Sequence, residues 1–161
     1  VEEQNCFEEL DIYDIAQNCV EMLRLSAKKH DVTMELHGVH RIICANRQMM
    51  DELVYNLCDN AIRYNNPGGR VDITVDAAVA FDKTAETGAT IIEVKDTGIG
   101  ISKEHQERIF ERFYRVDKSR SKSTGGTGLG LAIVKHIVEL HDARIYLESE
   151  VDKGTQIRIE F

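Results

Sequence analysis

Three stretches of the chain repeat apolar residues at the spacing of an amphipathic helix. The first follows Asp11 and Asp14, either of which can cap a helix that ends near 30–31; its apolar positions are Ile15, Val20, Leu23 and Ala27. A longer helix is expected over 46–64, where the turn-forming sequence Asn65-Asn66-Pro67-Gly68-Gly69 stops it. The third spans 129–140. A shorter helix is expected over 102–112, with Ser102 available as its N-cap.

Between these helices the pattern is that of strands. Short strands are expected at 7–12, 32–36 and 41–45, and longer, antiparallel ones at 71–79 and 90–95, joined by the polar stretch 82–88. A closing hairpin is expected from 144–149 and 155–161, around Asp152-Lys153-Gly154. Helices and strands are mixed without a regular βαβ alternation. We therefore expect an α+β protein, a two-layer α/β sandwich with a mixed, mostly antiparallel sheet and helices on one face.

Composition narrows the class of protein. The 161 residues fit one domain, and 42% hydrophobic residues suffice for a core. A net charge of −8 argues against a general nucleic-acid binder. No apolar run has the roughly 18–20 residues of a membrane span, and residues 1–9 are acidic and polar, unlike a signal peptide. The scattered cysteines Cys6, Cys19, Cys44 and Cys58 are expected as buried or half-buried thiols in a reducing compartment.

The helix over 46–64 carries an unusual polar face. Its members share one sector of the helix, opposite an apolar sector; they are Glu52, Asn56, Asp59, Asn60 and Arg63. A solvated face would explain the charges, but two asparagines one turn apart are less usual there, because Asn is a modest helix former. A carboxamide oxygen is a hard neutral ligand of the kind that Mg²⁺ accepts beside phosphates and waters. Asn56 and Asn60 are therefore candidate magnesium ligands.

A second candidate site follows the strand over 90–95. Asp96 stands at the strand end, before Gly98 and Gly100, which let the chain turn tightly and let a flat ligand approach the backbone. A plain strand-to-helix turn would explain the glycines. It would not explain a carboxylate at the edge of an apolar strand.

A third candidate is the glycine-rich stretch 125–131, which leads directly into a helix. Consecutive backbone N–H groups at a helix N-terminus bind anions. No Gly-Lys-Ser/Thr follows, so it is not a P-loop, and the basic loop before it excludes a dinucleotide-binding turn, which would follow a strand. Five cations precede it within eleven residues: Arg112, Arg115, Lys118, Arg120 and Lys122. They are either a solvated basic run or, as their position favours, a phosphate clamp, and we expect 117–127 to be a functional lid.

In this order and spacing, the three candidates resemble the catalytic, ATP-binding domain of bacterial sensor histidine kinases. The wider superfamily includes DNA gyrase, heat-shock chaperone ATPases and anti-sigma-factor kinases. Residues 52–64 resemble the N box, 96–100 the first glycine box, 110–117 the F box and 126–131 the second glycine box. The resemblance covers 7–161 and implies a Bergerat-type fold with an ATP lid between helices. Gly154-Thr155 resembles the closing Gly-Thr-x-Phe, although Ile157 replaces the aromatic residue and Asn46 stands where an acidic residue is common.

The resemblance also implies roles for single residues. Asn60, assisted by Asn56, would hold Mg²⁺, and Arg63 would reach a phosphate. Asp96 would accept a hydrogen bond from the adenine amino group, and Tyr64 would stack near the ring. The remaining nucleotide-binding residues would be Gly98, Gly100 and Ile101 in the pocket wall, Tyr114, Arg115, Lys118 and Arg120 on the lid side, Gly126, Thr127, Gly128, Leu129, Gly130 and Leu131 around the phosphates, and Thr155.

The implied reaction is transfer of the γ-phosphoryl group of Mg-ATP to a His of a dimerisation and phosphoacceptor domain, and then to an aspartate of a response regulator. Four residues before Asn60 stands Asn56, where hydrolysing branches carry a Glu; Glu52 lies a further turn away. The chain has one proline, Pro67, so none of its six histidines starts the acceptor pattern His-acidic-Thr/Ser-Pro. We therefore expect 1–161 to be a protein-histidine kinase fragment without its phosphoacceptor and sensor domains.

The resemblance further implies a cytoplasmic domain of a protein anchored in the cell membrane. The fragment would be monomeric, the full-length protein a homodimer, and no nucleic acid would be bound. Two alternatives stay open: a hydrolysing ATPase module of the same superfamily, and a non-catalytic nucleotide-binding scaffold. The intact Asn60 and Asp96 argue against the scaffold.

Overall fold

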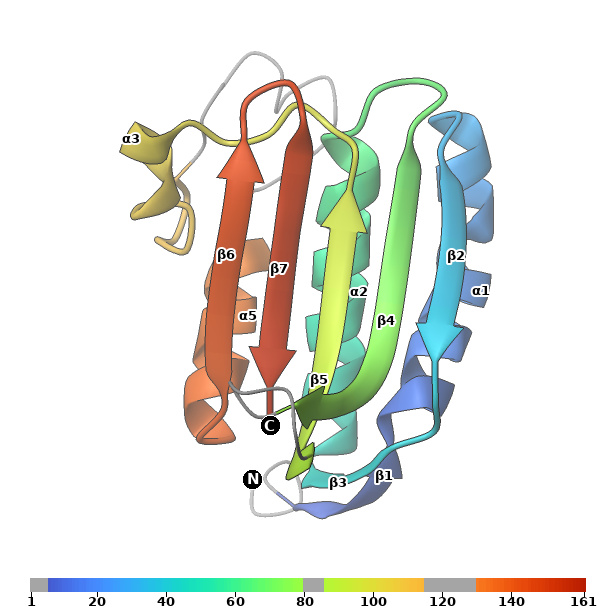
Figure 1. The fold of residues 1–161 in the computed structure, drawn as a ribbon, viewed down its shortest axis with the longest axis vertical. Coiled ribbons are helices and arrows are strands. Elements are labelled where there is room, and N and C mark those ends of the chain that lie inside the picture. The colour runs from blue at the N-terminus through green and yellow to red at the C-terminus, as the bar shows by residue number, and fades with distance from the viewer. Residues whose placement is uncertain (1–5, 80–85, 115–129) are drawn as a thin grey trace.

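The computed structural model describes residues 6–79, 86–114 and 130–161. Three helices cover one face of a five-stranded sheet, and a two-stranded sheet lies at one end (Figure 1). The expected α+β sandwich is confirmed: β2 and β4 are parallel, and the other pairs of the five-stranded sheet are antiparallel. The elements are β1 (Glu8–Asp11), α1 (Ile12–Lys29), β2 (Thr33–Gly38), β3 (Ile42–Ala45), α2 (Arg47–Arg63), β4 (Arg70–Val79), β5 (Glu86–Asp96), α3 (Lys103–Gln106), α5 (Gly130–Leu140), β6 (Arg144–Glu150) and β7 (Gly154–Glu160).

The two long helices begin at side-chain caps. Asp11 accepts a hydrogen bond from the Tyr13 amide at 3.0 Å, and Asn46 accepts one from the Met49 amide at 3.0 Å. Each cap satisfies a backbone donor that the first helical turn leaves free. Both helices begin and end within one or two residues of the expected positions, because caps and breakers are local signals.

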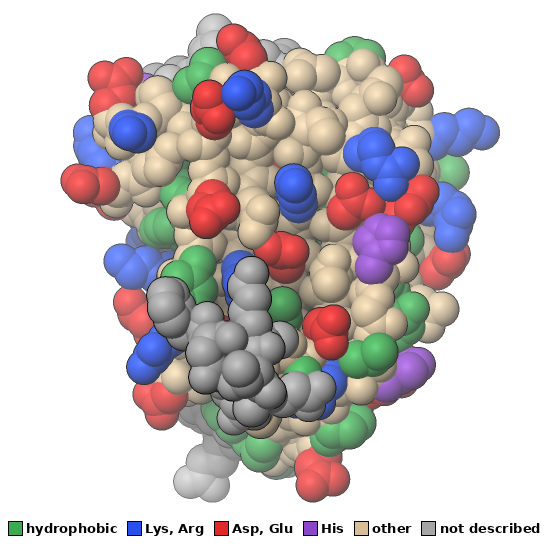
Figure 2. Space-filling model, in the orientation of Figure 1, with side chains coloured by type: hydrophobic (Ala, Val, Ile, Leu, Met, Phe, Trp, Pro, Cys, Tyr) green, Lys and Arg blue, Asp and Glu red, His purple; other side chains and the backbone are tan. Residues whose placement is uncertain are grey.

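The core lies between the helices and the sheet, whose strand order is β2-β4-β5-β7-β6. Alternate residues of the central strands point into it and are buried: Val71, Ile73 and Val75 on β4, Ile92 and Val94 on β5, and Ile157 and Ile159 on β7. The residues between them face outward. Figure 2 shows that open face, where acidic and basic side chains are interspersed. Among the described residues, no helix is both long and apolar enough to cross a membrane.

The expected helix over 102–112 is wrong in length. Only Lys103–Gln106 is α-helical, and the chain continues in successive turns, in which the amides of Arg108 and Glu111 bond the carbonyls three residues before them. Ser102 occupies the N-cap position, but its hydroxyl makes no capping bond. Ile109 is the buried side chain of this segment. A short helix needs tertiary packing to persist, and this one has little.

Two further expectations need correction. Strand β5 begins at Glu86 rather than Thr90, because a register shift between Ala77 and Val79 lets the hairpin with β4 continue to Val79↔Glu86. Cys19 and Cys58 are buried as expected, but Cys6 and Cys44 are exposed. Cys44 occupies an outward position of β3, whose residues alternate between exposed and buried. The expected lid, 117–127, lies outside the described residues.

Candidate nucleotide-binding site

The described residues of the candidate motifs lie at one end of the molecule, where β5 ends, α2 ends and α5 begins (Figure 1). The site is therefore assembled from segments far apart in the sequence. It lies next to the turn between β6 and β7.

Asp96, the last residue of β5, is fixed by two backbone donors. Its Oδ1 accepts hydrogen bonds from the amide of Gly98 at 2.8 Å and from the amide of Thr155 at 3.2 Å. Burial raises the pKa of Asp96 to about 6, because the loss of hydration outweighs these two hydrogen bonds. Its Oδ2 accepts no hydrogen bond from the other described residues, so one oxygen of a preoriented carboxylate is left for a ligand donor.

The two glycines after Asp96 allow very close backbone contacts. A Cβ on Gly98 would lie 2.3 Å from the Tyr64 carbonyl oxygen, and one on Gly100 would lie 2.0 Å from the Glu150 carbonyl oxygen. Gly100 also has a positive φ of 71°, which disfavours other residues. The loop 96–101 is thus wedged between the C-terminus of α2 and the β6–β7 turn.

Asn65, which the sequence indicates only as part of a turn, fixes the other side of this loop. It is 7% exposed, and its Nδ2 donates to the Arg70 carbonyl at 2.9 Å. Its Oδ1 accepts from the Asn66 amide at 2.8 Å and from the Thr97 hydroxyl at 3.3 Å. The same hydroxyl accepts from the Arg70 amide at 2.9 Å. Asn65 and Thr97 therefore tie the end of α2 and the start of β4 to the residue after Asp96.

The polar face of α2 meets the start of α5. A Cβ on Gly130 would lie 3.1 Å from Asn56 Oδ1, so a glycine here lets the two helices approach closely. Asn56 Nδ2 donates to the Glu52 carbonyl at 2.7 Å, which directs the amide oxygen toward α5. Asn60, one turn on, is half-buried, and its carboxamide makes no hydrogen bond within the described part of the chain. Two neutral amide oxygens on one helix face fit a Mg²⁺ ion that keeps waters and phosphate oxygens as its other ligands.

Some expected site residues have other contacts. Arg63 Nε pairs with Asp59 Oδ2 at 2.8 Å, and Tyr64 caps the C-terminus of α2 with its side chain half-buried. Tyr114 hydrogen-bonds to His105. Ile101 is half-buried beside the β6–β7 turn, and Leu131 packs half-buried against the core. Seven expected residues lie outside the described ranges: Arg115, Lys118, Arg120, Gly126, Thr127, Gly128 and Leu129.

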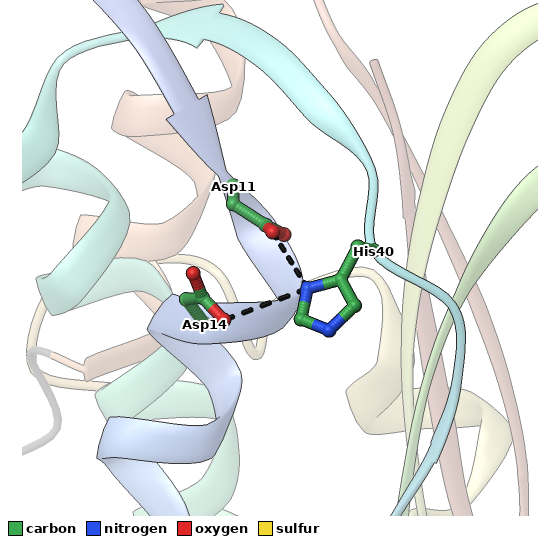
Figure 3. A group of neighbouring side chains, drawn as sticks. All are labelled: Asp11, Asp14 and His40. Atoms are coloured by element: carbon green, nitrogen blue, oxygen red, sulfur yellow. Dashed lines mark hydrogen bonds and ion pairs between the residues drawn. The ribbon is translucent and has the colours of Figure 1, made fainter.

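A separate group of metal-ligating side chains, Asp11, Asp14 and His40, lies at the N-terminus of α1 (Figure 3). His40 Nδ1 lies 2.6 Å from Asp11 Oδ2 and 3.5 Å from Asp14 Oδ1. These side chains already satisfy one another, and the positive end of a helix dipole disfavours a cation. The group lies at the other end of the molecule from Asp96 (Figure 1). We assign no metal to it.

Comparisons with known proteins agree with this geometry. Residues 45–161 match the family described as histidine kinase-, DNA gyrase B-, and HSP90-like ATPase. The chain is 43% identical over 141 residues to the sensor histidine kinase RppB of Synechocystis, covering 87% of this chain and 29% of RppB. It is 42% identical over 120 residues to the sensor protein SrrB of Staphylococcus aureus, covering 74% and 19% of the two chains. The chain thus spans less than a third of these relatives.

A solved structure shares the fold over nearly the whole chain. The mycobacterial sensor histidine kinase MprB has a TM-score of 0.78 and 26% identity, covering 96% of each chain. The family match includes α2, the loop after Asp96, α5 and the last two strands, which are the elements that build the site. The chain therefore belongs to the histidine kinase-, DNA gyrase B- and HSP90-like ATPase family, and is a nucleotide-binding domain of the histidine kinase type.

Proposed function

We propose that residues 1–161 are the ATP-binding catalytic domain of a two-component sensor histidine kinase. The domain transfers the γ-phosphoryl group of Mg-ATP to a His on a separate dimerisation and phosphoacceptor domain. From there the group passes to an aspartate of a response-regulator receiver domain. The similarity to RppB and SrrB supports this proposal, as does the arrangement of Asp96, Asn56 and Asn60.

The observation that carries the choice of a kinase is the environment of Asn56. A hydrolysing site needs a base or orienting carboxylate one turn before the metal-binding Asn. Here an amide stands at that position, and its Nδ2 is already engaged by the Glu52 carbonyl. An amide cannot accept a proton from an attacking water, so transfer to an acceptor outside the domain is favoured over hydrolysis.

Adenine recognition is assigned to Asp96. Its free Oδ2 would accept a hydrogen bond from the exocyclic amino group, where guanine presents a carbonyl oxygen instead. A half-buried carboxylate facing a carbonyl would be left unpaired, which disfavours guanine nucleotides by roughly 1–3 kcal/mol or more. Gly98, Gly100 and Ile101 would form the pocket wall, with Tyr64 beside the ring and Thr155 holding Asp96.

Phosphate binding is assigned to the α2–α5 side. Asn60 and Asn56 would hold Mg²⁺, which would neutralise charge on the phosphates when bound. The N-terminus of α5 at Gly130 and Leu131 would bind phosphate through backbone N–H groups. Arg63 would reach a phosphate, which requires it to leave or share Asp59. Further phosphate contacts are proposed for the lid side: Tyr114, Arg115, Lys118, Arg120, Gly126, Thr127, Gly128 and Leu129.

The proposed setting is a cytoplasmic domain of a membrane-anchored, homodimeric kinase, with the isolated domain monomeric and no nucleic acid bound. The test is to mix the domain with γ-labelled ATP and a matching phosphoacceptor helix pair and to look for acid-labile phosphohistidine on that partner. Asp96→Asn serves as the binding-deficient control. Steady phosphate release without the partner, and no label on it, would favour the hydrolysing ATPase. Failure to bind ATP at all would refute both readings.

A further inference from the structure

One serine links the loop after Asp96 to the last two strands. The hydroxyl of Ser149 on β6 accepts a hydrogen bond from the Ile101 amide at 2.8 Å. It lies 3.0 Å from the Gly154 carbonyl, to which it donates, and 2.8 Å from Oγ1 of Thr155. The amide of Thr155 is one of the two donors that fix Asp96. Ser149 thus fastens both the end of the glycine loop and the residue that holds the proposed adenine acceptor.

One glutamine then links this junction to α3. Gln106 Nε2 donates to the Ile101 carbonyl at 2.8 Å and to the Ser149 carbonyl at 3.1 Å. Both of its amide hydrogens are therefore used, one by a carbonyl of the loop after Asp96 and one by a carbonyl of β6. Within the described residues, these two bonds are the hydrogen bonds that tie the segment 103–114 to the loop after Asp96 and to β6.

The segment 103–114 is a single local unit. The Tyr114 hydroxyl bonds to His105 Nδ1, and the Arg108 guanidinium lies 4.5 Å from the centre of the Tyr114 ring. Ile109 buries its side chain, with 6% exposed. Tyr114 is the last described residue before 115–129. A movement of α3 would therefore carry Tyr114 with it.

These contacts form a continuous path from Asp96 through Thr155, Ser149 and Gln106 to Tyr114. We propose that Ser149 and Gln106 are positioning residues, which set the position of the segment 103–114 according to whether the adenine end of the site is occupied. This inference rests on the proposed function, because it takes Asp96 as the adenine acceptor. Neither residue touches the nucleotide; both act through the loop and the segment that they join.

The test is amide hydrogen exchange of residues 107–114 with and without AMP, which has a single phosphate and so reports mainly on the adenine end. In the wild-type domain, saturating AMP should slow exchange at least threefold. Gln106→Glu keeps the side-chain shape but replaces the Nε2 donor with an oxygen, which cannot donate to either carbonyl. It should abolish this slowing while the Kd for AMP stays within threefold. Gln17→Glu, the same change on the exposed face of α1, is the matched control and should behave as wild type.

A second pair of variants separates positioning from general loss of structure. Ser149→Ala should also uncouple AMP from residues 107–114, and Ser149→Thr, which keeps a hydroxyl on a strand, should restore the coupling. AMP-induced slowing that survives in Gln106→Glu would overturn the inference. Loss of AMP binding in that variant would also overturn it, because Gln106 would then belong to the pocket itself.

The proposed function can fail separately. If the wild-type domain binds neither AMP nor ADP, the proposed function is refuted. The positioning role of Gln106 is then tested in the ligand-free domain. There, Gln106→Glu should speed amide hydrogen exchange at residues 107–114 at least tenfold relative to Gln17→Glu. Exchange in α1 and α2 should stay unchanged. Equal exchange in the two variants would refute the positioning role of Gln106 as well.

Discussion

Asp96→Asn is expected to stabilise the free domain while it weakens nucleotide binding. The amide oxygen of Asn can take the place of Oδ1 and keep the bonds from the amides of Gly98 and Thr155. The substitution removes the charge and puts an N–H donor where Oδ2 was. The substitution therefore separates the effect of the charged carboxylate on stability from its proposed hydrogen bond to adenine.

The magnitude of the stabilisation follows from the pKa. Burial raises the pKa of Asp96 from 3.8 to about 6, so between about pH 4 and 6 the folded protein holds a proton that the unfolded chain has released. The free energy of unfolding therefore falls as pH rises through this window. A pKa difference of about 2 corresponds to about 3 kcal/mol in the free energy of unfolding. Solvent still reaches the half-buried group, so we expect a loss of stability of about 1–3 kcal/mol. Asp96→Asn should recover this amount at pH 7 and have no effect at pH 4.

Asp96→Asn should weaken nucleotide binding, although it stabilises the free domain. With Asn at this position, a side-chain N–H would face the adenine amino group, so one hydrogen bond is lost and two donors oppose each other. A cost of about 1–3 kcal/mol corresponds to an affinity for ADP about 5- to 150-fold weaker. Urea unfolding at pH 7 and pH 4 measures the first effect, and isothermal titration calorimetry with ADP measures the second. Asp51→Asn, at an exposed position on α2, is the matched control.

Two results would refute this reasoning. If Asp96→Asn unfolds at lower urea concentration than wild type at pH 7, the two backbone hydrogen bonds to the carboxylate outweigh its burial. If the variant binds ADP as tightly as wild type, Asp96 does not read the adenine amino group. Asp51→Asn should change neither measurement.

Three further outcomes are expected. Below pH 6, ADP affinity of the wild type should fall more steeply than that of Asp96→Asn, by about tenfold per pH unit, because binding favours the ionised carboxylate. Calorimetry at pH 5 and pH 7 measures both slopes, and the titration of the ADP phosphate is common to the two proteins. Gly98→Ala should lower the free energy of unfolding by about 1–3 kcal/mol, because the added Cβ would lie 2.3 Å from the Tyr64 carbonyl oxygen. Thermal denaturation measures this loss, and an unchanged melting temperature would contradict the packing described. Asn60→Ala should abolish the gain in ATP affinity that Mg²⁺ gives, as should EDTA. It should change the free energy of unfolding by less than about 0.5 kcal/mol, because the Asn60 carboxamide is half-exposed. Loss of stability without loss of the magnesium effect would assign Asn60 a structural role.

The sequence predicted what is encoded locally. The ends of α1 and α2 follow from Asp11, Asn46 and the turn after residue 64, and the buried faces follow from periodicity. The length of α3 was not predictable in this way, because it depends on how little tertiary packing the segment finds in the fold. The same holds for Asn65, Gln106 and Ser149, whose roles depend on carbonyls and amides from other segments. Their residue types carry no signal of their own, whereas Asp96 stands out beside its glycines.

The position of β7 affects the order in which the domain can assemble. It pairs with β5 on one side and β6 on the other, and it supplies the Thr155 amide that fixes Asp96. A chain still emerging from the ribosome has β4, β5 and α2 well before β7, but its carboxylate acceptor is not yet held in place. The proposed ATP site is thus incomplete on a nascent chain until β7, which is synthesised after the strands it joins, has paired. Nucleotide binding would therefore report completed folding rather than guide it.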